Sequence, residues 1–113
     1  MNIRDLIKED FGADLPINGG SGNSIENAVV IERSGFINDY VSTEYDYLKY
    51  IGLGRGIEWK SLGQELITHN NRTIEKIKIE TKETTETEII TQIETYYFDI
   101  TDCLDEPLDL TGV

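Results

Sequence analysis

The amino-acid sequence predicts an α+β fold: a curved antiparallel sheet, made of a short strand and a three-strand meander, packs against one main helix, with a short N-terminal helix beside them. Two observations lead to this expectation. Apolar residues recur at helical spacing in two early segments, whereas the second half alternates apolar and polar residues and is rich in Ile, Thr and Tyr. A chain of 113 residues supports one hydrophobic core, so we expect a single domain over 1–113.

The N-terminal part predicts a short helix, a glycine-rich loop and a strand. Over residues 2–11, apolar residues share one helical face: Ile3, Leu6, Ile7 and Phe11. Residues 12–27 are rich in glycine and asparagine and predict a flexible loop. The segment AVVIE, residues 28–32, predicts a short buried strand.

Residues 38–51 predict the main helix, which Gly52 and Gly54 are expected to end. The expected core stripe is Ile37, Val41, Tyr45 (or Glu44), Leu48 and Ile51. A second face carries tyrosine and glutamate side chains, namely Tyr40, Glu44, Tyr47 and Tyr50. Tyrosine suits both packing beside a core and anchoring a protein partner, so both interpretations of this face stay open.

Three extended segments follow the main helix and predict the meander: 56–69, 72–82 and 85–101. Asn70 and Asn71 tolerate the positive φ of a two-residue turn, so they predict a hairpin between the first two strands. In that register Glu65 lies opposite Lys76, and apolar residues gather on the other face of the sheet.

A four-residue turn over 83–86 sets the expected register of the last two strands. It pairs Lys82 with Thr87 and places Glu75 beside Glu94 on the apolar face. Two close carboxylates raise one pKa and can act as acid and base. The candidate lining of a pocket between helix and sheet is Gln64, Glu75, Gln92, Glu94 and Tyr96. The alternative is that these residues lie at a solvated end of the sheet.

The net charge is −12, from 22 acidic and 10 basic residues. Nucleic acids and anionic membranes are not expected partners because both are negatively charged, whereas a basic protein would be attracted. Residues 102–113 predict an acidic C-terminal tail, and we expect Asp102, Asp105 and Glu106 to help dock a basic partner. The alternative is that the charge serves solubility alone.

Several kinds of chemistry lack the residues they need. The segment GGSGNS has neither the lysine of a P-loop nor the third glycine of a dinucleotide loop. Arg55 could grip a carboxylate, but it follows a helix end, where we expect it to face solvent. One histidine, His69, and one cysteine, Cys103, argue against a zinc site or a nucleophilic dyad. We expect no metal, no cofactor and no catalytic residue, which favours a protein that is not an enzyme.

The expected compartment is the cytoplasm. The N-terminus has no apolar core or cleavage site of a secretory signal, and no apolar run is long enough to cross a bilayer. A single cysteine cannot form an internal disulfide, which agrees with a reducing compartment.

These features favour a non-enzymatic module that binds a basic partner protein. The size, the acidity and the segment EYDYLKYIGLGRGIEWK resemble those of small bacterial immunity-type proteins, and this resemblance implies an inhibitor that neutralises a toxin. The element order resembles that of cystatin-like and NTF2-like folds, which implies the alternative of a small-ligand-binding or hydrolytic domain. A further alternative is a homo-oligomeric structural subunit, such as a homodimer joined through an open sheet edge or the tyrosine face.

Overall fold

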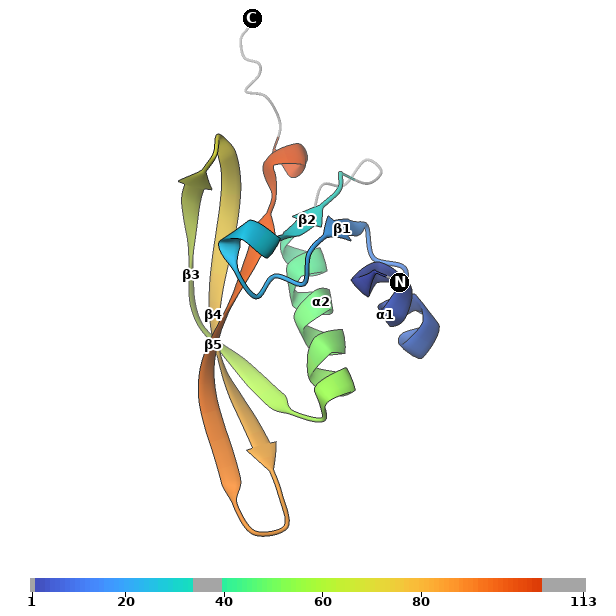
Figure 1. Ribbon diagram of the computed structural model, residues 1–113, viewed down its shortest axis with the longest axis vertical. Helices are drawn as coiled ribbons and strands as arrows, with labels where there is room; N and C mark the ends of the chain where they lie inside the picture. Colours follow the sequence, from blue (N-terminus) through green and yellow to red (C-terminus); the bar gives the residue numbers. More distant parts are fainter. Residues whose placement is uncertain (1, 34–39, 105–113) are drawn as a thin grey trace, which may run out of the picture.

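The computed structural model describes residues 2–33 and 40–104, and its described part confirms the α+β fold (Figure 1). Two α-helices and a five-stranded mixed sheet make up this part. In chain order they are α1 (Ile3–Phe11), β1 (Ile17–Gly19), β2 (Val29–Ile31), α2 (Tyr40–Arg55), β3 (Glu58–His69), β4 (Arg72–Thr84) and β5 (Ile89–Asp99). Short 3-10 helices cover Ile25–Asn27 and Thr101–Cys103.

The strand order in the sheet is β1-β2-β5-β4-β3. β3, β4 and β5 form the predicted antiparallel meander. β2 pairs with β5 in parallel, with Val29 beside Phe98 and Val30 beside Asp99, and β1 pairs antiparallel with β2. The sheet is therefore mixed. A parallel pair of strands needs a long crossover connection, and α2, β3 and β4 form this connection between β2 and β5.

The glycine-rich segment 12–27 is not a single loop, which corrects the prediction. It contains β1 and a 3-10 helix. The amide of Gly20 donates a hydrogen bond to the Ala28 carbonyl at 3.0 Å, and the amide of Tyr97 donates to the Gly22 carbonyl at 2.8 Å. Gly22 is buried with φ +90°, a conformation that favours glycine. These bonds attach the segment to both β2 and β5.

The predicted turn between β3 and β4 is confirmed. Asn70 and Asn71 have φ values of 52° and 63°, as a two-residue turn of this kind requires. Glu65 lies opposite Lys76, and its Oε1 is 3.7 Å from the lysine Nζ. Beyond this pair, a bulge between residues 61 and 63 interrupts the ladder.

The register between β4 and β5 differs from the predicted one by four residues. Lys82 pairs with Thr91 rather than Thr87, because β4 continues to Thr84 and the turn lies at 85–88. Because side chains alternate with a period of two, an even shift leaves every residue on its predicted face. The apolar face was therefore predicted correctly even though its cross-strand pairs were not.

The end of the β4–β5 hairpin projects away from both helices (Figure 1). Thr85 fixes its turn: the Thr85 amide donates to the Glu88 carbonyl at 2.8 Å, and the Glu88 amide donates to the Thr85 hydroxyl at 3.0 Å. We call residues 83–93 of this hairpin the arm.

α2 is longer than predicted at its C-terminal end. It runs through Gly52 and Gly54 to Arg55 and ends at Gly56, whose φ is +69°. Gly52 is buried against the ring of Trp59, and a Cβ at this position would lie 2.9 Å from the ring atom Cδ1. Close packing, rather than helix termination, therefore explains Gly52.

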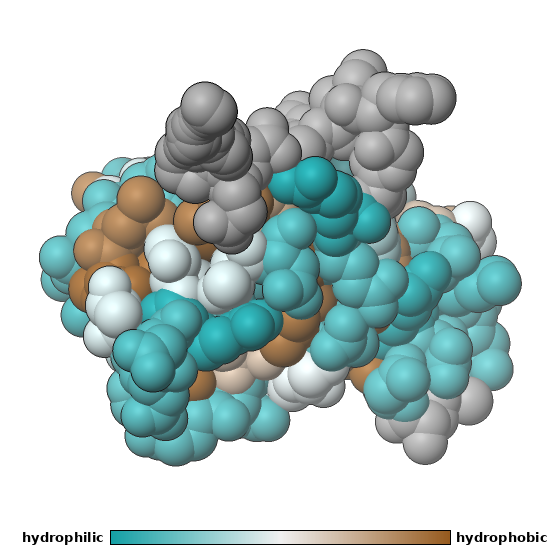
Figure 2. Space-filling view, turned by 90° about the horizontal axis from the view of Figure 1, so that it is seen from above, coloured by the Kyte–Doolittle hydropathy of each residue, from teal (hydrophilic) through white to brown (hydrophobic). Residues whose placement is uncertain are grey.

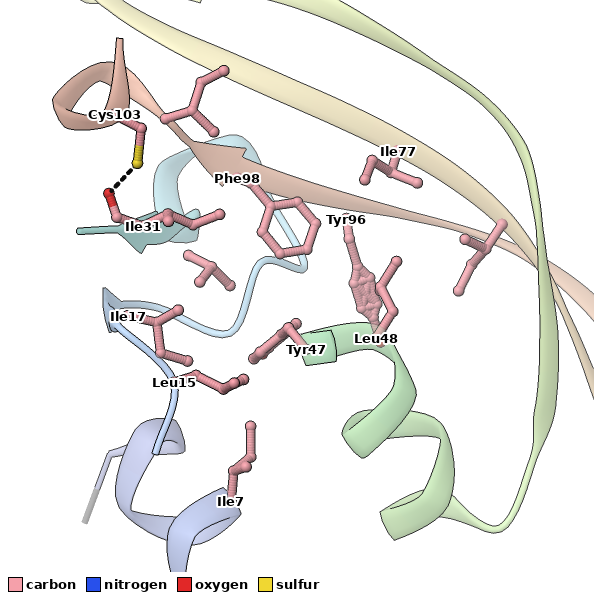
Figure 3. Packing of buried hydrophobic residues seen from close by; sticks show 13 residues of the cluster. Ile7, Leu15, Ile17, Ile31, Tyr47, Leu48, Ile77, Tyr96, Phe98 and Cys103 are labelled. Atoms are coloured by element: carbon pink, nitrogen blue, oxygen red, sulfur yellow. Dashed lines mark hydrogen bonds between the residues drawn. The ribbon is translucent and has the colours of Figure 1, made fainter. Parts of the chain in front are cut away.

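The face that α2 turns to the core matches the predicted one only in part: Tyr45 and Ile51 pack against the core, as expected. Its buried residues are Glu44, Tyr47, Leu48 and Gly52. Leu48 was expected there, but Val41 is 39 % exposed, and Ile37 lies outside the described residues. Figure 3 shows Tyr47 and Leu48 directed toward the sheet, where they pack with the buried side chains of β4 and β5.

Candidate functional site

The five residues predicted to line a pocket share one face of the meander. Glu75 and Tyr96 are buried, Glu94 is half-buried, and Gln64 and Gln92 are exposed. The prediction that Glu75 and Glu94 lie side by side is wrong, since the four-residue shift of register separates them. The structure brings Gln64 to Glu75, and Arg55 contacts both Glu94 and Tyr96, so the five residues fall into separate groups.

Aromatic side chains fill the space between helix and sheet at this point (Figure 3). The Tyr47 ring centroid is 6.4 Å from that of Tyr96 and 5.7 Å from that of Phe98. The Tyr47 hydroxyl donates a 2.7 Å hydrogen bond to the Ser21 carbonyl, so its one polar atom is satisfied inside the core. These residues build a packed core.

Glu94 is bound by Arg55 from the last turn of α2. The two guanidinium nitrogens of Arg55 donate to the two carboxylate oxygens at 2.7 and 2.8 Å, and Nη1 is 3.3 Å from the Tyr96 hydroxyl. The hydrogen bond from Arg55 lowers the pKa of Glu94 against the opposing effect of burial. Arg55 is exposed, as predicted, but it also grips a carboxylate, and that carboxylate belongs to its own chain.

The carboxyl group beside Glu75 is that of Glu44. Glu44 is fully buried, Glu75 is 5 % exposed, and neither oxygen of Glu44 nor Oε1 of Glu75 has a hydrogen-bond donor among the described residues. Burial raises the pKa of Glu44 to about 9, and the proximity of the Glu75 carboxyl group acts in the same direction. A protonated Glu44 can donate to Glu75, which two ionised carboxylates cannot do.

Polar side chains connect this carboxyl pair to the surface. The Gln64 amide nitrogen donates to Oε2 of Glu75 at 3.1 Å, and the Tyr45 hydroxyl donates to the Gln64 amide oxygen at 2.7 Å. Gln64 is exposed, so the chain of hydrogen bonds begins at solvent. The arrangement can hold a proton at Glu44 and fix the orientation of Glu75.

The face of α2 predicted to bind a partner is largely internal. Glu44 and Tyr47 are buried, which rules out an exposed stripe of the predicted composition. Tyr40 and Tyr50 are half-buried. The exposed Asp102 side chain lies 3.6 Å from an Arg72 nitrogen, while Asp105 and Glu106 lie outside the described residues.

Tyr50 contributes to a groove between α1 and α2. Its ring centroid is 5.1 Å from that of Phe11, and the groove has a volume of about 250 Å³. The lining is mainly apolar, with Asp10 and Arg55 at its margin. Lys8 and Lys49 are exposed on the same two helices, so the surroundings carry both signs of charge.

The single cysteine is buried, and the single histidine is the last residue of β3. Cys103 is buried, its thiol donates to the Ile31 carbonyl at 3.4 Å, and burial raises its pKa, which disfavours the reactive thiolate. His69 lies at the β3–β4 turn beside Asn70. Within 2–33 and 40–104, no group of three or more His, Cys, Asp or Glu is placed to hold a metal ion, and no helix is long and apolar enough to span a membrane.

Arginine side chains form ion pairs with carboxylates of the same chain. Arg4 binds Asp14 and Glu32, and Arg72 binds Asp99 at 2.9 Å. Nine carboxylates on the described surface form no ion pair with another described residue: Asp5, Glu9, Asp10, Glu26, Asp46, Glu58, Glu83, Glu86 and Glu88. Viewed from above, hydrophilic residues accordingly cover most of the surface, with smaller hydrophobic patches between them (Figure 2).

The arm combines three of these carboxylates with exposed apolar side chains. Glu83, Glu86 and Glu88 are exposed at its tip, and Ile89 and Ile93 behind them are 61 % and 58 % exposed. The site residues predicted from the sequence do not include this region. The sequence feature that could have indicated it is the segment EIITQI, which is rich in β-branched residues and contains no basic residue or proline.

Comparison with known proteins does not assign either site. Protein-family models, curated proteins and solved structures were compared with the chain, and none matches it. The carboxyl pair is enclosed by the core, whereas the arm presents acidic, apolar and main-chain groups to solvent. The arm is therefore the better candidate for contact with another molecule.

Proposed function

We propose that this protein is a non-enzymatic binding module that captures a partner protein with a basic surface, as an inhibitor or immunity-type protein does. One observation carries the proposal: arginines are paired with carboxylates of the same chain, and the exposed carboxylates that form no such pair are available to a partner protein. The net charge of −12 supports it, because such a charge attracts a cationic partner over long distance. The buried Cys103 thiol fits a cytoplasmic setting, which is part of the proposal.

The arm is the contact surface in this proposal. Charge alone gives fast but weakly specific association, whereas apolar anchors give a complex its lifetime. Ile89 and Ile93 supply exposed apolar area next to Glu86 and Glu88. The projection of the arm away from the helices gives a partner access to it (Figure 1).

The test compares two variants of equal charge. The first neutralises the arm (Glu83→Gln, Glu86→Gln and Glu88→Gln). The second neutralises α1 (Asp5→Asn, Glu9→Gln and Asp10→Asn). Each is immobilised beside the unmodified protein and exposed to a lysate of the native host, and the retained proteins are identified by mass spectrometry at low and high salt.

We expect the unmodified protein and the α1 variant to retain the same basic protein. The arm variant should retain about tenfold less of it, since each lost ionic contact contributes a few tenths to about 1 kcal/mol. Raising the salt from about 0.05 M to about 0.5 M should release it. Retention that is independent of salt, or a retained protein that is acidic, would show that the proposed function is wrong.

A further inference from the structure

The outer edge of β5 is open along the arm. β5 pairs with β4 from Ile89 to Asp99, but β2 accompanies it only at Phe98 and Asp99. In the described part of the chain, no strand lies on the other side of β5 between Ile89 and Thr95. An edge of this kind carries main-chain groups that another strand can pair with.

The direction of these main-chain groups follows from one hydrogen bond. The Tyr97 amide donates away from β4, to the Gly22 carbonyl at 2.8 Å. In an antiparallel pair, alternate residues direct both their amide and their carbonyl to the same side. Ile89, Thr91 and Ile93 therefore direct theirs to the open edge.

This edge lacks the features that normally prevent strand addition. Charged side chains, bulges and prolines protect most exposed edges. β3, the other long edge of the sheet, has Lys60 and a bulge at residues 61–63. From Ile89 to Gln92 the β5 edge has neither, and its side chains are those that favour strands.

The two faces of the arm specify the pattern of an added strand. Ile89 and Ile93 lie exposed on one face. On the opposite face Glu83 lies across from Ile90, and Glu88 precedes β5. An added strand that alternates apolar and basic residues would place apolar side chains beside Ile89 and Ile93, and basic ones on the face of Ile90 and Glu94, with Glu88 at its end.

We propose that the open edge of β5, from Ile89 to Thr95, binds an extended basic segment of the partner protein as a sixth strand of the sheet. The inference rests on the proposed function and adds how the partner is held. Charge favours this occupant over a second copy of the chain. Antiparallel copies centred on Thr91 would pair Ile89 with Ile93, but would place Glu88 opposite Glu94 and join two chains of net charge −12.

The test uses two synthetic peptides of identical composition and the full-length protein. In one, lysine and valine alternate; in the other, the same residues are grouped in two blocks. Both carry the same charge, but only the alternating peptide fits the two faces of the arm. Affinity is measured by calorimetry, and amide protection at residues 89–95 by nuclear magnetic resonance.

Three variants locate the binding. Thr91→Pro removes an amide that points to the open edge and not to β4, so the β4–β5 ladder keeps its hydrogen bonds. Ile93→Thr removes an exposed apolar side chain while it keeps a strand-forming residue. Leu66→Thr is the matched control on β3, where Leu66 is 56 % exposed. Thermal unfolding of each variant verifies that it is folded.

We expect the alternating peptide to bind about tenfold more tightly than the block peptide and to protect the amides of the open edge. Thr91→Pro should remove this advantage, Ile93→Thr should reduce it about threefold, and Leu66→Thr should leave it unchanged. Equal, salt-sensitive binding of both peptides would overturn strand addition while leaving charge-driven capture intact. No binding of either peptide would overturn both. A dimer in sedimentation that Thr91→Pro dissociates would show that a second copy occupies the edge.

Discussion

Glu94 and Glu75 both face α2 from the sheet, yet they meet opposite partners there. Glu94 receives two hydrogen bonds from Arg55, at 2.7 and 2.8 Å, and its pKa is lowered. Glu75 meets the buried Glu44, whose pKa is raised to about 9, first by burial. Along one face of the sheet, Glu94 is therefore kept ionised by Arg55, whereas Glu75 lies against a helix carboxyl, that of Glu44, which is kept protonated.

The difference shows that position along α2 decides the chemistry. Arg55 lies in the last turn, where both its stem and its partner reach partly into solvent, whereas Glu44 lies in the fully buried part. A charged pair at the margin stabilises the fold modestly, but a buried carboxyl must give up its charge. The two sites should therefore respond to pH in opposite directions.

The signs follow from proton linkage. Because the folded-state pKa of Glu44 is raised, the unfolded state releases this proton first, and stability falls as pH rises from about 4.5 to about 9. Because the folded-state pKa of Glu94 is lowered, its stabilising effect is present above the pKa of the unfolded chain and is lost on acidification.

The largest expected effect comes from Glu44→Gln. Glutamine removes the ionisation and supplies an amide that can donate to Glu75, so the free energy of unfolding at pH 7 should rise by about 2–3 kcal/mol. The gain should shrink as the pH falls toward 4.5, because the unfolded state then increasingly binds the proton as well. Urea denaturation between pH 5 and pH 9 measures both the gain and its slope.

Asp46→Asn is the matched control for this prediction. It removes a carboxylate from the same helix at an exposed position. We expect it to change the unfolding free energy by a few tenths of a kcal/mol and to keep the pH slope of the unmodified protein. If Glu44→Gln keeps that slope as well, Glu44 is not the protonated group.

The contrast between these two sites was only partly visible in the sequence. The Asn70–Asn71 turn is a local property, so it fixed the β3–β4 register and the position of Glu75. The β4–β5 register depends on the turn, and turns over 83–86 and 85–88 leave the same residues on the apolar face. Alternation alone therefore could not separate Glu75 from Glu94.

The face that α2 turns to the core was harder still to predict. Apolar spacing assigned Val41 to the core and left Glu44 only as an alternative to Tyr45. The structure instead buries Glu44 and Tyr47 and leaves Val41 exposed. Burial of an ionisable side chain departs from the local pattern, so it is seen only when Glu75 is known to lie opposite.

The second prediction tests the other member of the comparison. Arg55→Met keeps most of the side-chain stem but leaves the half-buried Glu94 without its partner. We expect a loss of about 1–2 kcal/mol at pH 7, discounted from a buried pair because Arg55 is partly exposed. The loss should be smaller near pH 3 than at pH 7, because acidification favours the protonated form of Glu94, which does not need a charged partner. An equal loss at both pH values would mean that Arg55 acts through packing. Adding Glu94→Gln to the Arg55→Met variant should then restore none of the lost free energy of unfolding.

The smallest expected effect concerns the hydrogen bond that orients Glu75. Gln64→Ala removes the amide that donates to Oε2 of Glu75 at 3.1 Å, and the exposure of Gln64 limits the expected loss to about 0.5–1 kcal/mol. Gln92→Ala, at an exposed position on β5, is the control and should lower the free energy of unfolding by a few tenths of a kcal/mol at most. In a Glu44→Gln background the loss should shrink, because the new amide offers Glu75 a second donor. Additive losses in this double-mutant cycle would show that Gln64 and Glu44 do not act on the same carboxylate.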